Sequence, residues 1–172
     1  VLVGDLLKAM LIVSANDATL ALARHTAGSV EAFVGEMNAE ARRLGMSDTA
    51  FQNPVGFDDP GHFSTAADLS LLVAEFLRYP ELVKIVGTEK EMIYSVDRRH
   101  RHELLTTNRL MIEYPEVEGL KTGYTEEAKG NLIILVDEPN HPGFEYFSIL
   151  LGSDNREAET KSIMTWVQNH FQ

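Results

Sequence analysis

Cysteine is absent from this 172-residue chain, and tryptophan and positive charge are scarce. Without cysteine there is no disulfide, no thiol nucleophile and no thiolate metal ligand. The 15 lysines and arginines stand against 26 acidic residues, which gives a formal net charge of -11. Nucleic acids and anionic membranes bind clustered basic side chains, so the composition argues against both classes of partner.

Long apolar runs are also missing, since a membrane-spanning helix takes about 20 apolar residues. The apolar start of the chain, residues 1–13, is interrupted by Asp5 and Lys8. It has no basic segment before it, so it is not typical of a signal peptide. Its apolar spacing predicts an amphipathic helix. Because the first residue is Val1 and a core helix follows almost at once, we expect the chain to be a piece of a longer protein.

The hydrophobic pattern changes between the two halves of the chain. The first half predicts helices over residues 5–13, 18–25, 29–44, 65–76 and 80–86, with Asn16 or Asp17 capping the second helix and an ordered loop over residues 46–63. The second half predicts strands over residues 91–96, 119–124, 131–137 and 144–152, the last two joined by a hairpin connection over 138–143. A closing helix is expected to pack on this sheet, with Ile163, Trp166, Val167 and Phe171 on its buried face. This order is typical of the α+β class, in one domain.

One short segment is strongly basic: Arg98-Arg99-His100-Arg101-His102. It is flanked by acidic residues, and we interpret it as a solvated loop. The pair His100 and His102 is the closest approach to metal-ligand spacing among the six histidines, and a metal site is not expected there.

The tripeptide Lys121-Thr122-Gly123 lies in a predicted strand. Glycine inside a strand is unfavourable unless a bulge or a close backbone approach requires it. A peptide bound antiparallel to the strand edge would be such an approach. Lys121 supplies a positive charge and Thr122 a hydroxyl, a combination suited to a terminal carboxylate. The tripeptide alone carries little weight, because a strand can contain it by chance.

The surrounding segments resemble the D-alanyl-D-alanine carboxypeptidases, the low-molecular-weight penicillin-binding proteins. Residues 118–128 are similar to the third active-site motif of that family, and residues 11–18, with Ser14-Ala15-Asn16, are similar to its second motif. Further similar segments follow in the family's order: residues 37–38, 44–46, 51–56, 62–68 and 156–161, with Trp166. The resemblance implies a β-lactamase/transpeptidase-like fold, an antiparallel sheet packed with helices, here lacking the N-terminal strands and the nucleophile helix.

The resemblance implies catalytic roles for Ser14, Asn16 and Lys121. Ser14 would relay a proton between the catalytic lysine and the leaving amine. Asn16 would hydrogen-bond the substrate amide and help to orient that lysine. The alternative for Ser14 and Asn16 is that both are merely helix-capping residues.

Substrate binding is implied for Thr122, Gly123, Tyr124 and Arg156. Lys121 and Thr122 would bind the carboxylate of a terminal D-alanine or of a β-lactam. The backbone N–H of Tyr124 would form half of an oxyanion hole. Arg156 would contribute to carboxylate recognition, or would be only a first-turn charge on the last helix.

The remaining signature of the family, a serine followed three residues later by lysine, occurs nowhere in the chain. The family places it well before the Ser-x-Asn motif, so its absence fits an N-terminal truncation. Residues 1–172 are then expected to be the C-terminal portion of a single catalytic domain, inactive alone and with an uncovered sheet edge that invites self-association. Residues Glu127-Ala128-Lys129 also depart from the family pattern, which has two small residues and a glycine there.

The complete protein is expected to be a serine-type carboxypeptidase that removes the terminal D-alanine of peptidoglycan pentapeptides through an acyl-enzyme. β-Lactams would inhibit it, no cofactor or nucleic acid is implied, and it would be exported to the periplasm or the outer face of the bacterial envelope. Two alternatives stay open. One is a non-catalytic cell-wall binding module, and the other is a β-lactamase or endopeptidase of related fold, although Ala15 stands where class A β-lactamases typically carry aspartate.

Overall fold

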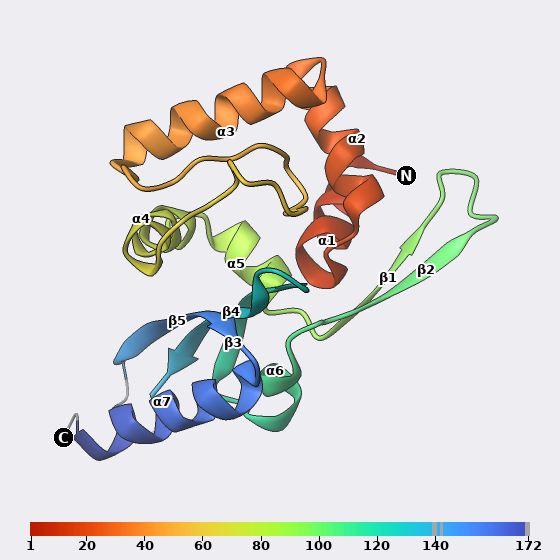
Figure 1. The fold of residues 1–172 in the computed structure, drawn as a ribbon. Coiled ribbons are helices and arrows are strands. Elements are labelled where there is room, and N and C mark those ends of the chain that lie inside the picture. The colour runs from red at the N-terminus through yellow and green to blue at the C-terminus, as the bar shows by residue number, and fades with distance from the viewer. Residues whose placement is uncertain (139–140, 142, 171–172) are drawn as a thin grey trace. The chain divides into compact units, whose positions relative to one another are not determined.

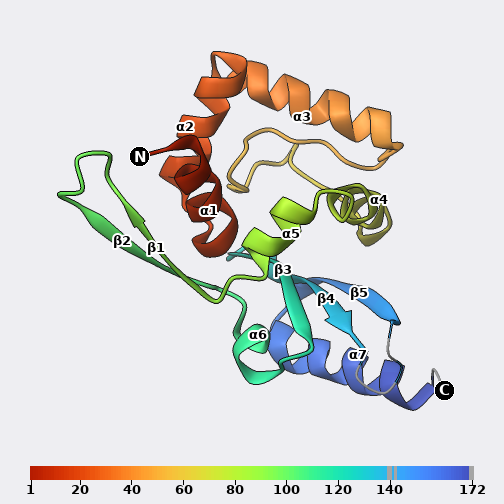
Figure 2. The same ribbon diagram turned by 180° about the vertical axis from the view of Figure 1, so that it is seen from behind.

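The computed structural model describes residues 1–138, 141 and 143–170. The chain divides into two compact units, residues 1–107 and residues 108–172 (Figures 1 and 2). Helices and antiparallel sheets are both present, as the sequence predicted for an α+β protein.

The first unit contains most of the helices. Its elements are α1 (Val3–Val13), α2 (Asn16–Ala27), α3 (Val30–Leu44), α4 (Ala66–Phe76), α5 (Pro80–Val86), β1 (Lys90–Tyr94) and β2 (Arg101–Leu105). The two strands form an antiparallel hairpin in which Ile93 lies opposite His102. Apolar residues of α1, α2 and both strands make one core cluster: Ala9, Ile12, Ala18, Ile93 and Leu104.

The turn between α1 and α2 differs from the sequence prediction. Helix α2 begins at Asn16, and its N-cap is Ala15, which makes no side-chain capping bond. Neither Asn16 nor Asp17 is the cap, so that prediction is wrong. The reason is that Ser14 ends α1 in the left-handed conformation, with φ 57°, and only Ser14 and Ala15 lie between the two helices, so Ala15 takes the cap position.

The predicted loop over residues 46–63 is joined to two helices by hydrogen bonds of one partly buried and one buried polar side chain. Asn38 of α3 donates to the carbonyl oxygen of Phe51 at 2.8 Å and accepts from the N–H of Phe51 at 2.9 Å. Asp68 of α4 accepts from the N–H of Asp48 at 2.8 Å and from the hydroxyl of Thr49 at 2.7 Å. These bonds satisfy backbone groups that a loop would otherwise leave unpaired.

The second unit is a three-stranded antiparallel sheet with two helices. It contains α6 (Arg109–Glu113), β3 (Val117–Thr125), β4 (Lys129–Asp137), β5 (Glu145–Ser153) and α7 (Arg156–His170), and the strand order is β3-β4-β5. Helix α7 packs on β4 and β5, as expected for the closing helix. The buried cluster of this unit comprises Leu110, Met111, Val117, Leu132, Ile134, Val136 and Met164.

Several local predictions fail in identifiable ways. Helix α6 and strand β2 were not expected, and β2 begins inside the basic segment that was interpreted as a loop. Trp166 is 54% exposed and stacks on the ring of His170, whereas Met164 takes the buried position on that helix. Phe171 and part of the 138–143 connection lie outside the described residues.

Candidate active site

The Lys-Thr-Gly tripeptide lies on β3, an edge strand of the three-stranded sheet. On the paired side of β3, Lys121 is opposite Ile133 and Gly123 is opposite Asn131. The position therefore suits a strand that receives an extended ligand along its edge.

Gly123 is not part of a bulge. The register shift in the pairing of β3 with β4 lies between Val117 and Leu120, before the tripeptide. A Cβ added to Gly123 would meet the Cβ of Asn131 at 3.7 Å, which is ordinary van der Waals contact. Of the two reasons considered for a glycine at this point, the bulge is excluded, and the close approach of a ligand backbone stays a prediction.

Lys121 is a largely buried cation. Its Nζ donates to the carbonyl oxygen of Thr122 at 2.8 Å. Burial, and then the positive charge of Arg156, lower the pKa of Lys121 to about 8. A poorly hydrated ammonium group interacts more strongly with an anion than an exposed one does, because less water screens the pair.

The side chain of Arg156 contacts the backbone of the tripeptide. It is the first residue of α7, and its Nη1 donates to the carbonyl oxygen of Gly123 at 2.8 Å. Its Nε pairs with Glu157 Oε1 at 3.1 Å. The structure thus brings the start of α7 to the strand that carries the tripeptide, which the sequence alone did not reveal.

Gly130 is a site-forming residue that sequence reasoning missed. A Cβ on Gly130 would lie 2.8 Å from the carbonyl oxygen of Ser153 and 3.2 Å from the Cβ and Cδ of Arg156. Only a glycine therefore leaves room for the Arg156 side chain against β4. A glycine at the beginning of a predicted strand was the available signal, since such a glycine often marks a close approach.

Tyr124 follows the tripeptide on β3, and its side chain is 62% exposed. Its hydroxyl lies 3.3 Å from Glu126 Oε1, on the same stretch of chain. The oxyanion role expected for the backbone N–H of Tyr124 stays a prediction.

Ser14 and Asn16 lie in the first unit, at the turn between α1 and α2. Ser14 has φ 57° and ψ 41°, a conformation that is uncommon for residues other than glycine and occurs often at functional sites. Asn16 occupies the first turn of α2, and no side-chain hydrogen bond is recorded for it within the described part of the chain. Asn16 is thus not the cap of α2, whereas Ser14 is the C-cap of α1. The catalytic roles expected for both residues stay predictions.

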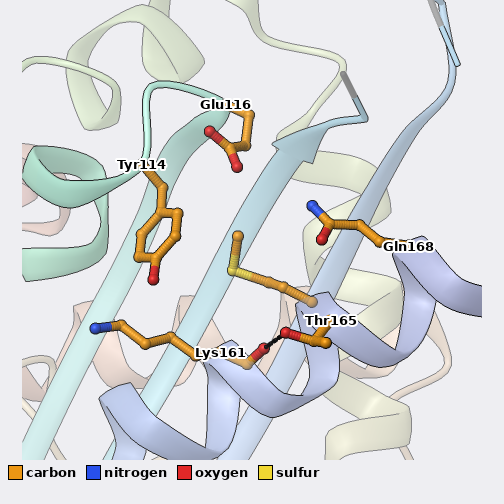
Figure 3. A pocket seen from close by; sticks show the side chains of 6 residues that line it. Tyr114, Glu116, Lys161, Thr165 and Gln168 are labelled. Atoms are coloured by element: carbon orange, nitrogen blue, oxygen red, sulfur yellow. Dashed lines mark hydrogen bonds between the residues drawn. The ribbon is translucent and has the colours of Figure 1, made fainter. Parts of the chain in front are cut away.

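A small pocket in the second unit is separate from all of these residues. It has a volume of about 120 Å³ and is lined by Tyr114, Glu116, Lys161, Met164, Thr165 and Gln168 (Figure 3). Lys161 pairs with Glu113 and lies 5.4 Å from the centre of the Tyr114 ring. These contacts join α7 to α6, and none of the predicted site residues lines the pocket.

Metal-ligand groups of three or more His, Asp or Glu side chains are not found among residues 1–138, 141 and 143–170. Within the same residues, no helix has the length and apolar character needed to cross a membrane.

Solved structures of penicillin-binding proteins share this fold. A DD-transpeptidase of Streptomyces K15, in its S216A form, has a TM-score of 0.87 at 26% identity, over 96% of this chain and 68% of the other. Penicillin-binding protein D2 of Listeria monocytogenes, in the ampicillin-bound form, has a TM-score of 0.78 at 31% identity, over 96% and 66%. The α+β, transpeptidase-like fold class expected from the sequence is confirmed.

Sequence comparison identifies the family. The model of the D-alanyl-D-alanine carboxypeptidase family matches residues 1–144, and the chain belongs to that family. D-alanyl-D-alanine carboxypeptidase DacF of Bacillus subtilis is 42% identical over 127 residues, which are 74% of this chain and 32% of DacF. DacC of Escherichia coli is 36% identical over 99% of this chain and 42% of its own length. The chain thus spans less than half of the length of either relative.

Proposed function

We propose that the protein containing this chain is a serine-type D-alanyl-D-alanine carboxypeptidase, which removes the terminal D-alanine of peptidoglycan pentapeptides through an acyl-enzyme. The observation that carries the proposal is the placement of Lys121, Thr122 and Gly123 on an edge strand, with Arg156 bonded to that strand. An extended peptide bound along β3 would bring its terminal carboxylate to two cationic side chains and a hydroxyl.

Each candidate residue has a distinct task in this reaction. Lys121 and Thr122 bind the carboxylate of the terminal D-alanine, with Arg156 as a second positive charge. The backbone N–H of Tyr124 stabilises the oxyanion of the tetrahedral intermediate. In the first unit, Ser14 transfers a proton to the leaving amine, and Asn16 bonds the substrate amide.

The nucleophile of the proposed reaction is not in this chain, because no serine is followed three residues later by lysine. We propose that residues 1–172 are the C-terminal portion of a catalytic domain whose Ser-x-x-Lys motif precedes them, and that these residues alone are inactive. The share of DacC that the chain spans, 42%, supports this proposal. The whole protein would act outside the cytoplasmic membrane, where its peptidoglycan substrate lies.

β-Lactams are the proposed inhibitors, because their carboxylate and acyl group mimic the terminal D-alanyl unit. Penicillin-binding protein D2 of Listeria monocytogenes has been solved in ampicillin-bound and cefotaxime-bound forms, at 31% identity to this chain. The same binding mode would place the β-lactam carboxylate at Lys121 and Thr122.

Labelling with a fluorescent penicillin tests the proposal. The full-length protein is expected to form a covalent adduct, and peptide mapping should place it on a serine of a Ser-x-x-Lys sequence outside residues 1–172. The isolated 172-residue chain should remain unlabelled. An unlabelled full-length protein would overturn the catalytic proposal and favour a peptidoglycan-binding module instead.

Matched variants connect the labelling to the candidate site. Thr122→Val should slow acylation about tenfold, because a hydrogen bond to a charged group is worth roughly 1.5–3 kcal/mol. Ser162→Ala removes a hydroxyl from the exposed side of α7, where it donates to the carbonyl oxygen of Ala158, and should leave the acylation rate unchanged. Equal acylation rates in the two variants would remove Thr122 from the site.

A further inference from the structure

The connection between β1 and β2 is an ordered turn that carries the basic segment. The hydroxyl of Ser95 donates to Asp97 Oδ1 at 2.6 Å and accepts from the N–H of His100 at 2.9 Å. Asp97 Oδ1 also accepts from the N–H of Arg99 at 3.2 Å. Figures 1 and 2 both show this turn at the outer end of the hairpin, away from α4 and α5 of the same unit. The term "hairpin tip" denotes residues 94–101 below.

The charges of the hairpin are distributed unevenly. Near its base, the acidic residues Glu91 and Glu103 are neutralised by ion pairs with Lys8 and Lys90. At the tip, Arg98 and Arg101 are exposed and have no ion pair recorded within the described residues, while Arg99 pairs loosely with Asp97 at 3.5 Å. A chain with a net charge of -11 therefore presents a locally positive hairpin tip.

Apolar side chains lie exposed among these arginines. Tyr94, at the end of β1, is 46% exposed, and Val96, in the turn, is 75% exposed. Both line an open groove of about 300 Å³, together with Leu2, Met92, Arg98 and the acidic Asp5. Two apolar side chains next to three arginines form a mixed apolar and basic surface, and apolar surface rimmed by polar residues can mark a membrane interaction site.

We propose that the hairpin tip docks on an anionic phospholipid membrane. Arg98, Arg99 and Arg101 would contact lipid phosphates, and Tyr94 and Val96 would enter the interface between the headgroups and the acyl chains. Basic side chains next to aromatic and aliphatic ones are the composition of interfacial membrane segments, and tyrosine is favoured at the depth of the headgroups. This surface lies outside the candidate active site and does not depend on the carboxypeptidase proposal.

The apolar pair favours a membrane over a soluble polyanion. A polyanion in water would bind the arginines and gain nothing from Val96, whereas a bilayer removes both apolar side chains from water. The overall negative charge repels an anionic surface, but salt screens charges more than about 10 Å away. The charge that a membrane meets is therefore set by the three arginines of the tip, against Asp97 of the tip and Asp5 of the groove.

Vesicle binding of the full-length protein tests the proposal, with a fluorescent probe at the hairpin tip. The chain has no cysteine, so Val96→Cys offers a single thiol within it for an environment-sensitive fluorophore. Phosphatidylcholine vesicles containing phosphatidylglycerol should shift the probe emission to the blue, and pure phosphatidylcholine vesicles should not. A probe at Glu36→Cys, on the exposed face of α3, should show no shift with either vesicle.

Charge variants carrying the probe at position 96 distinguish binding by the arginines of the hairpin tip from an effect of the overall charge of the chain. The double variant Arg98→Gln with Arg101→Gln should need an anionic lipid concentration about 25-fold higher for the same emission shift. Each basic residue near an anionic surface increases the membrane affinity about fivefold. Arg24→Gln with Arg42→Gln, which removes the same charge from α2 and α3, should change it less than twofold.

Three results would overturn the membrane proposal. The first is no emission shift at position 96 on anionic vesicles, and the second is an equal loss of the shift in both charge variants. The third is binding of the hairpin tip to soluble polyphosphate that is as tight as its binding to vesicles and is unaffected by Val96→Ser. That result would instead identify a soluble polyanion as the partner of the hairpin tip.

Discussion

The guanidinium of Arg156 donates to the carbonyl oxygen of Gly123 at 2.8 Å, joining the first residue of α7 to the last residue of the Lys-Thr-Gly tripeptide. This bond places a second cation beside Lys121, and that charge contributes to the lowered pKa of Lys121. The geometry of the tripeptide and the protonation of its lysine therefore depend on the same side chain.

Removal of Arg156 should change both properties. In Arg156→Gln, the lost charge and bond should slow penicillin acylation of the full-length protein about tenfold, as expected for a charge-assisted hydrogen bond. The pKa of Lys121 should rise toward its usual range, because its repulsive neighbour is gone. The pH dependence of the acylation rate measures this rise, and Arg42→Gln, on the exposed side of α3, is the control. An unchanged pH profile in Arg156→Gln would contradict the electrostatic link.

The proposed carboxylate-binding role of Lys121 predicts a basic limit to activity. Its pKa is lowered to about 8, so the cation that binds the substrate carboxylate is lost as the pH rises through that value. The second-order acylation rate constant, which reports the free enzyme, should fall above about pH 8. In Lys121→Arg the charge persists, so any residual rate should lack this decline. A decline that persists unchanged in Lys121→Arg would assign the titration to another group.

The same lysine predicts a pH dependence of folding. Between about pH 8 and its ordinary value of 10.5, the unfolded chain binds a proton at Lys121 that the folded chain does not. The free energy of unfolding should therefore increase with pH across this window. Urea denaturation at a series of pH values measures it, and Lys121→Met should reduce the increase. An identical pH dependence in Lys121→Met would show that burial of Lys121 does not carry the effect.

Substitution of Gly130 by alanine should cause a steric clash that the same substitution at Gly35 does not cause. Gly130→Ala places a Cβ 2.8 Å from the carbonyl oxygen of Ser153, so the chain must shift, at a cost of roughly 1–3 kcal/mol in the free energy of unfolding. Gly35→Ala, on α3, meets no atom within 4 Å and should instead stabilise the helix by about 0.5–1 kcal/mol. Urea denaturation of both variants gives the comparison, and destabilisation of the same size in both would exclude the steric explanation.

The hydrogen bonds of Asp68 are expected to stabilise the loop over residues 46–63. Asp68→Ala removes the acceptor of the Asp48 N–H and the Thr49 hydroxyl, and should lower the free energy of unfolding by roughly 1–3 kcal/mol. Glu36→Ala removes an exposed carboxylate from α3 and should have an effect within about 0.5 kcal/mol. Amide hydrogen exchange at Asp48 should also accelerate in Asp68→Ala, and unchanged exchange there would show that other contacts hold the loop.

Sequence patterns predicted the longer elements because those depend on neighbours along the chain. Gly28 and Gly45 do end their helices in the left-handed conformation that glycine tolerates. Helix α6 has five residues, too few to show a repeated helical pattern. Strand β2 was missed because its sequence, Arg-His-Glu-Leu-Leu, does not alternate between apolar and polar residues. Trp166 and Val167 were both expected on the buried face of the closing helix; Val167 is buried, whereas Trp166 is exposed and stacks on the ring of His170.

The sequence by itself determined the family resemblance, the order of the motifs and the absence of a Ser-x-x-Lys serine, since these are properties of residue identity and spacing. Only the tertiary structure decided that Arg156 bonds to Gly123, that Gly130 makes room for it, and that ion pairs neutralise the base of the hairpin and leave its tip positive. These relationships join residues that are distant in sequence, and they arise only when strands pair and helices pack against them.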